Sequence, residues 1–294
     1  MAHTSRAVLR QPSLVAVTGI HHGLGNRVRV VLGSRSLAQL EERAFFHTWH
    51  TGQEFGARFD ELWQVDDSVI SRRTARLLSL RYPFRDEKLE WLDDAARAAR
   101  VLQIRTPHAL HLPAAAEPWE VQLRALRPVD AVGDRVLDFF ASRLAGAPYV
   151  GVMVRTHPNS HEATLRESPL DWYLGRMRDI RAERPDIQFF VSADTAEAQE
   201  RISEAIPGSH ALTDKGGYNT RQALQSSVSD LYLLAGSTHV LGPHFSSFPE
   251  LAQKLAGPGL ALETSHSAAD AKWAASEALY VVDDPLSPHI RRTA

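Results

Sequence analysis

The sequence predicts an α/β protein built from two Rossmann-like, doubly wound domains. Short apolar runs rich in β-branched residues alternate with helical stripes, which is the pattern of parallel β-α-β units. The sequence Gly146-Ala-Pro148 separates two such series, so we expect domains over 1–146 and 147–294. Two domains that face one another across a central cleft suit the binding of two substrates, one per domain.

The composition excludes several classes of protein. Hydrophobic residues make up 44% and charged residues 23% of the 294 residues, as in ordinary globular proteins. The net charge is −2 without a long basic run, so we expect no nucleic-acid partner. The absence of cysteine excludes disulfides and thiolate chemistry. The first apolar run, 14–18, is too short for a signal peptide or a membrane span, and we expect a cytoplasmic protein.

The first domain opens with a β-loop-α-β pattern. We expect a strand over 14–18, a glycine-rich turn over 19–25, a helix over 26–42 and a strand over 44–49. The region 50–127 is less regular, with helices predicted around 59–63 and over 87–100 and a strand over 101–105. An amphipathic helix over 128–144 completes the domain.

The second domain alternates more cleanly. The predicted strands cover 149–155, 187–192, 210–213, 238–242 and 259–262. The helices between and after them cover 169–183, 195–205, 219–235 and 247–255. A last helix over 268–279, which we expect to pack back on the N-terminal domain, precedes a short extended piece at 280–282.

The glycine-rich turn Gly19-Ile-His-His-Gly-Leu-Gly25 is the first candidate site. Glycines let the backbone approach a ligand, and the N-terminus of the following helix favours negative charge. The spacing matches neither the dinucleotide fingerprint nor a P-loop, so an ordinary tight turn is the alternative. The adjacent His21 and His22 favour function, because an imidazole can act as a base near neutral pH.

Arg155 ends the most strand-like run of the chain. Ligands of open α/β sheets bind at the carboxyl ends of strands, and a guanidinium suits a phosphate. Pairing with a surface carboxylate is the alternative. Pro158 and Asn159 predict a loop rather than a helix after it, and this loop holds His157, His161 and Glu162. No third ligand at a recognisable spacing accompanies the histidines, so we expect no metal site.

Polar residues also follow other strands of the second domain. Asp194 ends one strand and either contacts a ligand or caps the next helix. Ser246 and Ser247 begin a helix after the strand 238–242 and suit a small anion site or a helix cap. Asp230 is interpreted as a first-turn partner of a helix dipole. Arg155, Asp194 and the two serines share one sheet edge, where a nucleotide is expected to bind.

Taken in order, four motifs resemble the fucosyltransferase superfamily with the GT-B fold. This superfamily includes α1,6-fucosyltransferases, nodulation fucosyltransferases among them, and protein O-fucosyltransferases. The motifs are Gly23-Leu-Gly-Asn-Arg27, Val152-Met-Val-Arg155, Val191-Ser-Ala-Asp194, and Ser229-Asp-Leu-Tyr-Leu-Leu-Ala235 running on to Phe245-Ser-Ser247. The resemblance spans most of the chain, but residues 50–127 match no known motif.

The resemblance implies an inverting glycosyltransferase that needs neither a metal nor a cofactor. It would move a sugar, usually fucose, from a GDP-sugar donor in the C-terminal domain to an acceptor hydroxyl of a carbohydrate or small molecule, held largely by the N-terminal domain. By motif, Arg155 would hold the β-phosphate, Asp194 the guanine, and Ser246 and Ser247 the phosphates or nucleoside. The donor-binding set in the glycine loop would be Gly23, Gly25, Asn26 and Arg27, with Asn26 facing the transferring sugar.

Two departures from the family pattern leave alternatives open. Met153 stands where the family usually has a histidine, and Thr156-His157-Pro158 replaces the residues that usually follow the arginine. A UDP or dTDP donor, or a nucleotide-sugar-binding protein without transferase activity, is therefore an alternative. Family members place the general base in either of two loops, which here hold His22 and Glu162. We favour His22 over Glu162.

Overall fold

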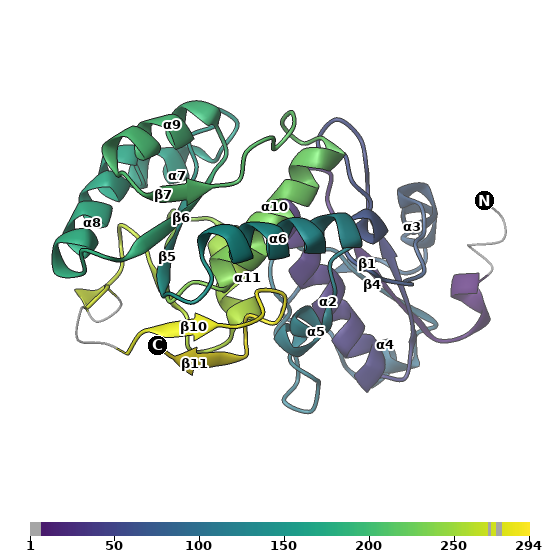
Figure 1. Ribbon diagram of the computed structural model, residues 1–294. Helices are drawn as coiled ribbons and strands as arrows, with labels where there is room; N and C mark the ends of the chain where they lie inside the picture. Colours follow the sequence, from purple (N-terminus) through teal and green to yellow (C-terminus); the bar gives the residue numbers. More distant parts are fainter. Residues whose placement is uncertain (1–6, 270–271, 275–277) are drawn as a thin grey trace. The chain divides into compact units, whose positions relative to one another are not determined.

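The computed structural model describes residues 7–269, 272–274 and 278–294 (Figure 1). The chain divides into two compact units. The first comprises Met1–Val129 with Gly217–Leu224, and the second comprises Asp130–Gly216 with Gln225–Ala294. Each unit contains a parallel sheet covered by helices, which confirms the predicted α/β class with two Rossmann-like units. The domain boundary at 146 and the central cleft stay predictions.

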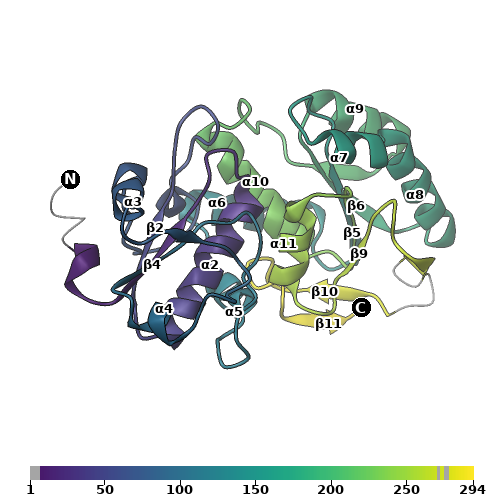
Figure 2. The same ribbon diagram turned by 180° about the vertical axis from the view of Figure 1, so that it is seen from behind.

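The sheet of the first unit is parallel and has the strand order β2-β1-β4-β3. Its strands are β1 (Ser13–Val17), β2 (Ala44–Thr48), β3 (Phe84–Arg85) and β4 (Val101–Ile104). Alternation along β1 buries Leu14 on the side of α2 (Leu24–Leu40) and Val15 on the side of α3 (Arg72–Leu78). Both faces of the sheet are therefore covered, as parallel sheets require (Figure 2).

The region between β2 and α6 (Asp130–Arg143) holds short elements. They are η1 (Phe59–Glu61), α3, β3, α4 (Asp94–Ala98) and α5 (Trp119–Ala125); the sequence did not predict α3, β3 or α5. The helix predicted over 87–100 was too long. Leu89 adopts a left-handed φ of 59°, and the Asp93 side chain caps α4 by accepting from the backbone N–H of Ala96.

The second unit begins with α6 (Asp130–Arg143), and its parallel sheet has the order β7-β6-β5-β8-β9. The strands are β5 (Tyr149–Val154), β6 (Gln188–Ala193), β7 (Ser209–Ala211), β8 (His239–Leu241) and β9 (Ala261–Glu263). In chain order this is 3-2-1-4-5, the order of a doubly wound nucleotide-binding unit. The order reverses between β5 and β8, so the crevice for a ligand is expected beyond their carboxyl ends.

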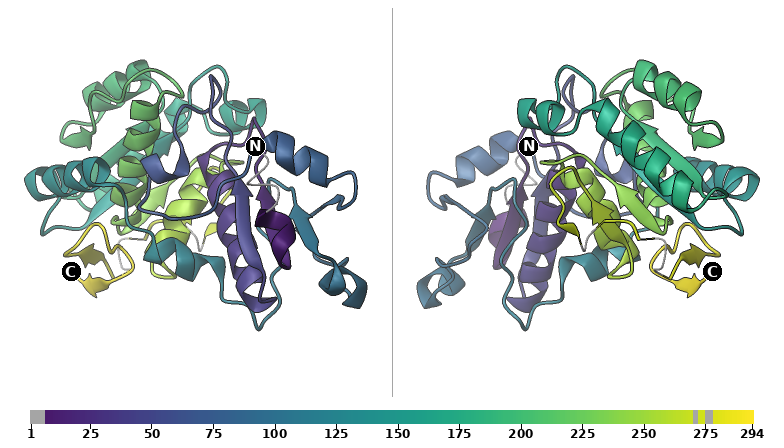
Figure 3. Two further views of the ribbon diagram at one scale, coloured as in Figure 1. Left: turned by 90° about the vertical axis from the view of Figure 1, so that its right-hand side faces the viewer. Right: turned by 90° about the vertical axis from the view of Figure 1, so that its left-hand side faces the viewer.

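Helices cover both faces of this second sheet (Figure 3). On one face, α8 (Leu170–Glu183) and α9 (Ala196–Ala205) bury Tyr173 and Ile202 against Val150 and Val152. The other face carries α10 (Arg221–Ala235) and α11 (Ser247–Ala256). A Cβ on Gly151 of β5 would lie 2.9 Å from the side chain of Leu234, so this glycine lets α10 approach the sheet.

The chain ends in a two-stranded antiparallel sheet of β10 (Tyr280–Val282) and β11 (Arg291–Thr293). Arg291 holds it to the second unit by donating to the backbone carbonyls of Ser237, at 2.8 Å, and Ala235. The helix predicted over 268–279 is absent at 272–274 and 278–279, where Trp273 instead packs in the core of the second unit. Residues 270–271 and 275–277 of this prediction lie outside the described residues, and packing on the N-terminal domain stays a prediction. Among the helices of the described part of the chain, none has the length and apolarity that a membrane crossing needs.

Candidate active site

Arg155 lies at the carboxyl end of β5, where the strand order reverses. The strand before it is buried throughout, because Tyr149–Val154 offers only apolar side chains and glycine to the two helical layers. The Arg155 Nη1 atom lies 3.5 Å from Oδ2 of Asp194, and about a third (32%) of the Arg155 side chain is exposed. The arginine therefore has a carboxylate partner, while part of its side chain remains accessible.

The Asp194 carboxylate holds the loop that follows Arg155. Its Oδ1 accepts hydrogen bonds from the backbone N–H groups of Thr156 at 2.8 Å and His157 at 3.2 Å, and from the Thr156 hydroxyl. Its Oδ2 accepts from the Ser160 hydroxyl at 3.3 Å. The N-cap of α9 is Thr195, whose hydroxyl accepts from the Ala198 backbone N–H. Asp194 is thus not the helix cap. Its oxygens accept four hydrogen bonds from the loop, which favours a positioning role, and the predicted contact with guanine stays a prediction.

The loop after Arg155 is shorter than the sequence predicted. Helix α7 (Glu162–Glu167) begins three residues beyond Asn159, because the side chain of His161 caps it by accepting from the backbone N–H of Ala163 at 3.2 Å. The expectation that Glu162 lies in an irregular loop is therefore wrong. Glu162 occupies the exposed first turn of α7. Among the described residues, no group of three or more His, Asp or Glu side chains is arranged to hold a metal ion.

Ser246 and Ser247 lie where the N-terminus of α11 meets the end of β8. A Cβ on Gly242 would approach the Pro249 side chain to 2.8 Å, so glycine is needed for the helix to begin this close to the strand. The Ser246 hydroxyl caps α11 by accepting from the Phe248 backbone N–H at 3.4 Å. Phe245 before it has a left-handed φ of 60° and an exposed ring. Non-glycine residues in this conformation gather at functional sites.

A buried ion pair lies beside this edge and was not predicted as part of it. Oδ2 of Asp230, on α10, accepts from the Ser192 hydroxyl and from Nζ of Lys215, both at 2.7 Å. Asp230 lies in the third turn of α10, so its interpretation as a first-turn dipole partner was wrong. An acid directly before the apolar run Leu231–Leu234 was the available signal, since a buried carboxylate needs a partner. The second carboxylate oxygen, Oδ1, is buried without a hydrogen-bond partner.

In the first unit, Arg27 holds the glycine loop from within. Its side chain is fully buried, and its guanidinium donates to the backbone carbonyls of His22 at 2.7 Å, His50 at 2.6 Å and Ile20 at 3.0 Å. The same guanidinium lies 4.0 Å from the centre of the Phe55 ring, a cation–π contact. With no exposed surface, Arg27 cannot contact a donor directly, and we reassign it to positioning of the loop.

His22 is poorly suited to act as a general base. Its Nδ1 accepts a hydrogen bond from the Gly19 backbone N–H at 3.0 Å, so in the neutral ring the proton resides on Nε2 and no nitrogen lone pair remains free. Burial, then the charges of Arg27 and Arg105, lowers the pKa of His22 to about 4. A base works best with a pKa near the working pH. The structure therefore argues against our preference for His22 over Glu162.

The remaining residues of the loop surround the start of α2. Gly23 is the N-cap residue and is exposed, while Gly25 is buried in the first turn. No acidic residue occupies this turn, so the positive end of the 17-residue helix is not offset locally. Oδ1 of Asn26 is buried without a hydrogen-bond partner. Asn26 thus remains a candidate contact for a polar ligand.

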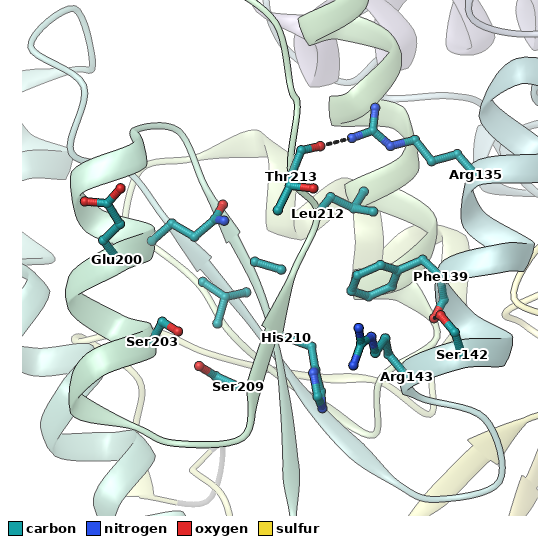
Figure 4. A pocket seen from close by; sticks show the side chains of 13 residues that line it. Arg135, Phe139, Ser142, Arg143, Glu200, Ser203, Ser209, His210, Leu212 and Thr213 are labelled. Atoms are coloured by element: carbon teal, nitrogen blue, oxygen red, sulfur yellow. Dashed lines mark hydrogen bonds between the residues drawn. The ribbon is translucent and has the colours of Figure 1, made fainter.

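A separate hollow of about 640 Å³ lies in the second unit along the edge strand β7 (Figure 4). Side chains of α6 and α9 line its two sides, among them Phe139 and Arg143 from α6 and Glu200 and Ser203 from α9. Arg135 at its upper end in Figure 4 donates to the Thr213 carbonyl. It contains none of the site residues predicted from the sequence.

Comparison with known proteins identifies the fold. No protein-family model and no curated protein matches the sequence. Among solved structures, the fucosyltransferase NodZ from Bradyrhizobium is 18% identical, with a TM-score of 0.57 over 83% of this chain and 93% of that chain. A mutant of FUT1 from Arabidopsis thaliana in complex with GDP is 13% identical, with a TM-score of 0.59 over 92% of this chain and 75% of that one. POFUT1 in complex with GDP-fucose is 13% identical, with a TM-score of 0.52 over 87% and 99%.

These structural neighbours are fucosyltransferases, and the chain shares their α/β fold across most of its length. The resemblance of the four motifs to the GT-B fucosyltransferases is thus confirmed at the level of the fold.

Proposed function

We propose that this protein is a glycosyltransferase that moves fucose from GDP-fucose to an acceptor hydroxyl. The observation that carries the proposal is the position of Arg155, a partly exposed cation at the carboxyl end of β5, where the strand order of the second sheet reverses. Support comes from the shared fold, since NodZ has been crystallised with GDP and soaked with GDP-fucose, and POFUT1 has been crystallised with both.

The second unit is assigned the donor. Arg155 offers a charged fork to the diphosphate, and the first backbone amides of α11 with the hydroxyls of Ser246 and Ser247 offer further donors. As the bond between the sugar C1 and the phosphate oxygen breaks, negative charge develops on the GDP leaving group. Preorganised donors that stabilise this charge are the main requirement of a reaction without a metal.

The acceptor is assigned to the first unit. The hydroxyl oxygen of the acceptor attacks C1 of the sugar while GDP leaves from the opposite face, so the anomeric configuration inverts. The hydroxyl proton passes to a carboxylate. We assign the proton to Glu162, which is exposed in the first turn of α7, because the neutral ring of His22 has no free nitrogen lone pair. Asn26 with Gly23 and Gly25 contributes polar contacts to the transferring sugar. No cofactor or metal takes part in this scheme.

A panel of nucleoside diphosphates tests the donor. GDP is expected to raise the melting temperature, while UDP and dTDP have little effect, because only a ligand that binds the folded state stabilises it. Incubation with GDP-fucose should release free fucose slowly even without an acceptor. Arg155→Ala should abolish both the shift and the hydrolysis, whereas Arg178→Ala, an exposed arginine on α8, should change neither.

One observation favours a second candidate function, a nucleotide-sugar-binding protein without transferase activity. Met153, which replaces the family's usual histidine, is buried in β5 and brings no polar group to the site. GDP binding without any release of fucose would support this function. A shift with UDP or dTDP in place of GDP would instead support a transferase with a different donor. Cytoplasmic location and the lack of a nucleic-acid partner stay predictions.

A further inference from the structure

A hollow of about 500 Å³ lies at the carboxyl end of β2 in the first unit. It is lined by Trp49, His50 and Thr51, which follow β2, and by Val69–Arg73, which lead into α3. The second segment is fixed beside the strand, because the Ile70 backbone N–H donates to the His47 carbonyl at 2.8 Å. The walls of the hollow are thus built by backbone pairing and do not depend on a ligand.

The charged groups that line this hollow are all cationic or basic. Arg72 and Arg73 are exposed, and within the described part of the chain neither forms an ion pair or a side-chain hydrogen bond, whereas Arg35 of the same unit pairs with Asp67. No acidic residue lines the hollow. Burial and then the charges of Arg72 and Arg27 lower the pKa of His50. An anion in the hollow would offset this concentration of positive charge.

The side chain of Arg27 joins one wall of the hollow to the glycine loop. Arg27 donates to the carbonyl of His50, at the hollow, and to the carbonyl of His22, in the loop. Strands β1 and β2 are neighbours in register, with Val17 opposite Thr48, so the segments that follow them leave the sheet side by side. A molecule seated in the hollow therefore lies next to the loop whose residues are assigned to the transferring sugar.

We propose that this hollow binds an oxyanion carried by the acceptor, so that the enzyme transfers to a carbohydrate bearing a phosphate, sulfate or carboxylate group. Arg72 and Arg73 supply guanidinium forks that match such groups in shape and charge, and His50 supplies a further polar contact. The inference rests on the proposed transferase function for its biological meaning. The binding of an anion in the hollow is independent of that function.

Direct binding tests the inference without any need for turnover. The protein, saturated with GDP so that its donor site is filled, is titrated calorimetrically with a neutral oligosaccharide and with its sulfated, phosphorylated and carboxylated counterparts. We expect at least one anionic form to bind at least tenfold more tightly than the neutral one, with an affinity that falls as salt rises. The double variant Arg72→Gln/Arg73→Gln should lose this preference and keep its affinity for GDP.

Arg76→Gln is the matched control, because Arg76 is an exposed arginine on the same helix that does not line the hollow. It removes one positive charge from the same helix, against two in the double variant, and should leave the preference intact. Equal binding of neutral and anionic oligosaccharides, or equal loss in Arg76→Gln and in the double variant, would overturn the inference. A failure of the protein to bind GDP or release fucose counts against the proposed function instead. Transfer assays with the same oligosaccharides should show the same preference in kcat/KM.

Discussion

The Arg155 guanidinium and the Asp194 carboxylate lie 3.5 Å apart, and the same carboxylate holds the backbone that follows Arg155. The Asp194 carboxylate therefore holds both the guanidinium of Arg155 and the loop that follows it. Because the Asp194 side chain is mostly buried (9% exposed), this arrangement is less screened than a surface ion pair. We therefore expect Asp194 to act on a ligand through Arg155 and the loop.

Asp194→Ala should weaken GDP binding and slow transfer by roughly ten- to a hundredfold, because two backbone N–H groups lose their acceptor and Arg155 loses its partner. The measurement compares the affinities of GDP and inosine diphosphate, which lacks the 2-amino group of guanine. If Asp194 is a positioning residue, its replacement weakens the binding of GDP and of inosine diphosphate by the same factor. A selective loss of GDP affinity would instead assign Asp194 to the base.

Glu162→Gln should lower kcat by about a hundredfold or more and leave GDP affinity unchanged, because general-base catalysis typically contributes 10²–10⁴ in rate. Glu183→Gln, an exposed acid on α8, is the control and should be silent. Steady-state transfer and GDP titration together separate the rate from binding. A Glu162→Gln variant with normal kcat would move the base elsewhere.

His22→Gln should reduce kcat only severalfold. Glutamine can keep an acceptor for the Gly19 N–H, and the lowered pKa of the His22 imidazole, about 4, leaves little basicity to lose. The same transfer assay at pH 7 checks this. A loss as large as that expected for Glu162→Gln would restore His22 as the base.

The strands and helices that position the site could be predicted because their signals are local. The β-branched run before Arg155, the proline after it and the serines at the start of α11 are each visible within a few residues of sequence. Alternation with helical stripes then places their ends at one edge of a parallel sheet. The four motifs added a resemblance to one family, which these local patterns alone do not provide.

The direction of individual side chains could not be predicted in this way. Arg27 was predicted from its motif to contact the donor, but carbonyls of Ile20 and of His50, 23 positions away, accept its hydrogen bonds inside the unit. The pair of Lys215 and Asp230 likewise joins residues 15 positions apart, and only the fold brings them together. The partner that a polar side chain finds depends on which backbone groups and charges the fold brings near it and leaves without other partners.

Arg27→Met should destabilise the first unit by about 3 kcal/mol, because three partly buried carbonyls would lose their donor. Urea unfolding measures the free energy, with Arg76→Met as an exposed control on α3. Arg27→Lys should recover only part of the loss, since one ammonium on a flexible stem does not reproduce the guanidinium's fixed geometry. Equal stability of Arg27→Met and the wild type would show that the loop does not depend on this residue.

His47 should make the protein sensitive to mild acid. It is fully buried beside the rings of Trp49 and Phe59, and neither ring nitrogen has a hydrogen-bond partner among the described residues. Burial lowers the pKa of His47 to about 4, with the charges of Asp67 and Arg35 acting in opposite directions. The unfolded chain, where the pKa is 6.5, therefore binds more protons than the folded one between pH 6.5 and 4.

The stability that His47 contributes is accordingly complete above pH 6.5 and is lost as the pH falls toward 4, by at most about 3 kcal/mol. Replacement by an aromatic ring that does not titrate, His47→Phe, should make the decline in unfolding free energy between pH 7.5 and 4.5 smaller by an amount of this order. Urea unfolding at several pH values measures it, with His22→Gln as a parallel variant because the pKa of His22 is lowered in the same direction. If the wild type and His47→Phe declined in parallel, the buried imidazole would not be what couples this fold to pH.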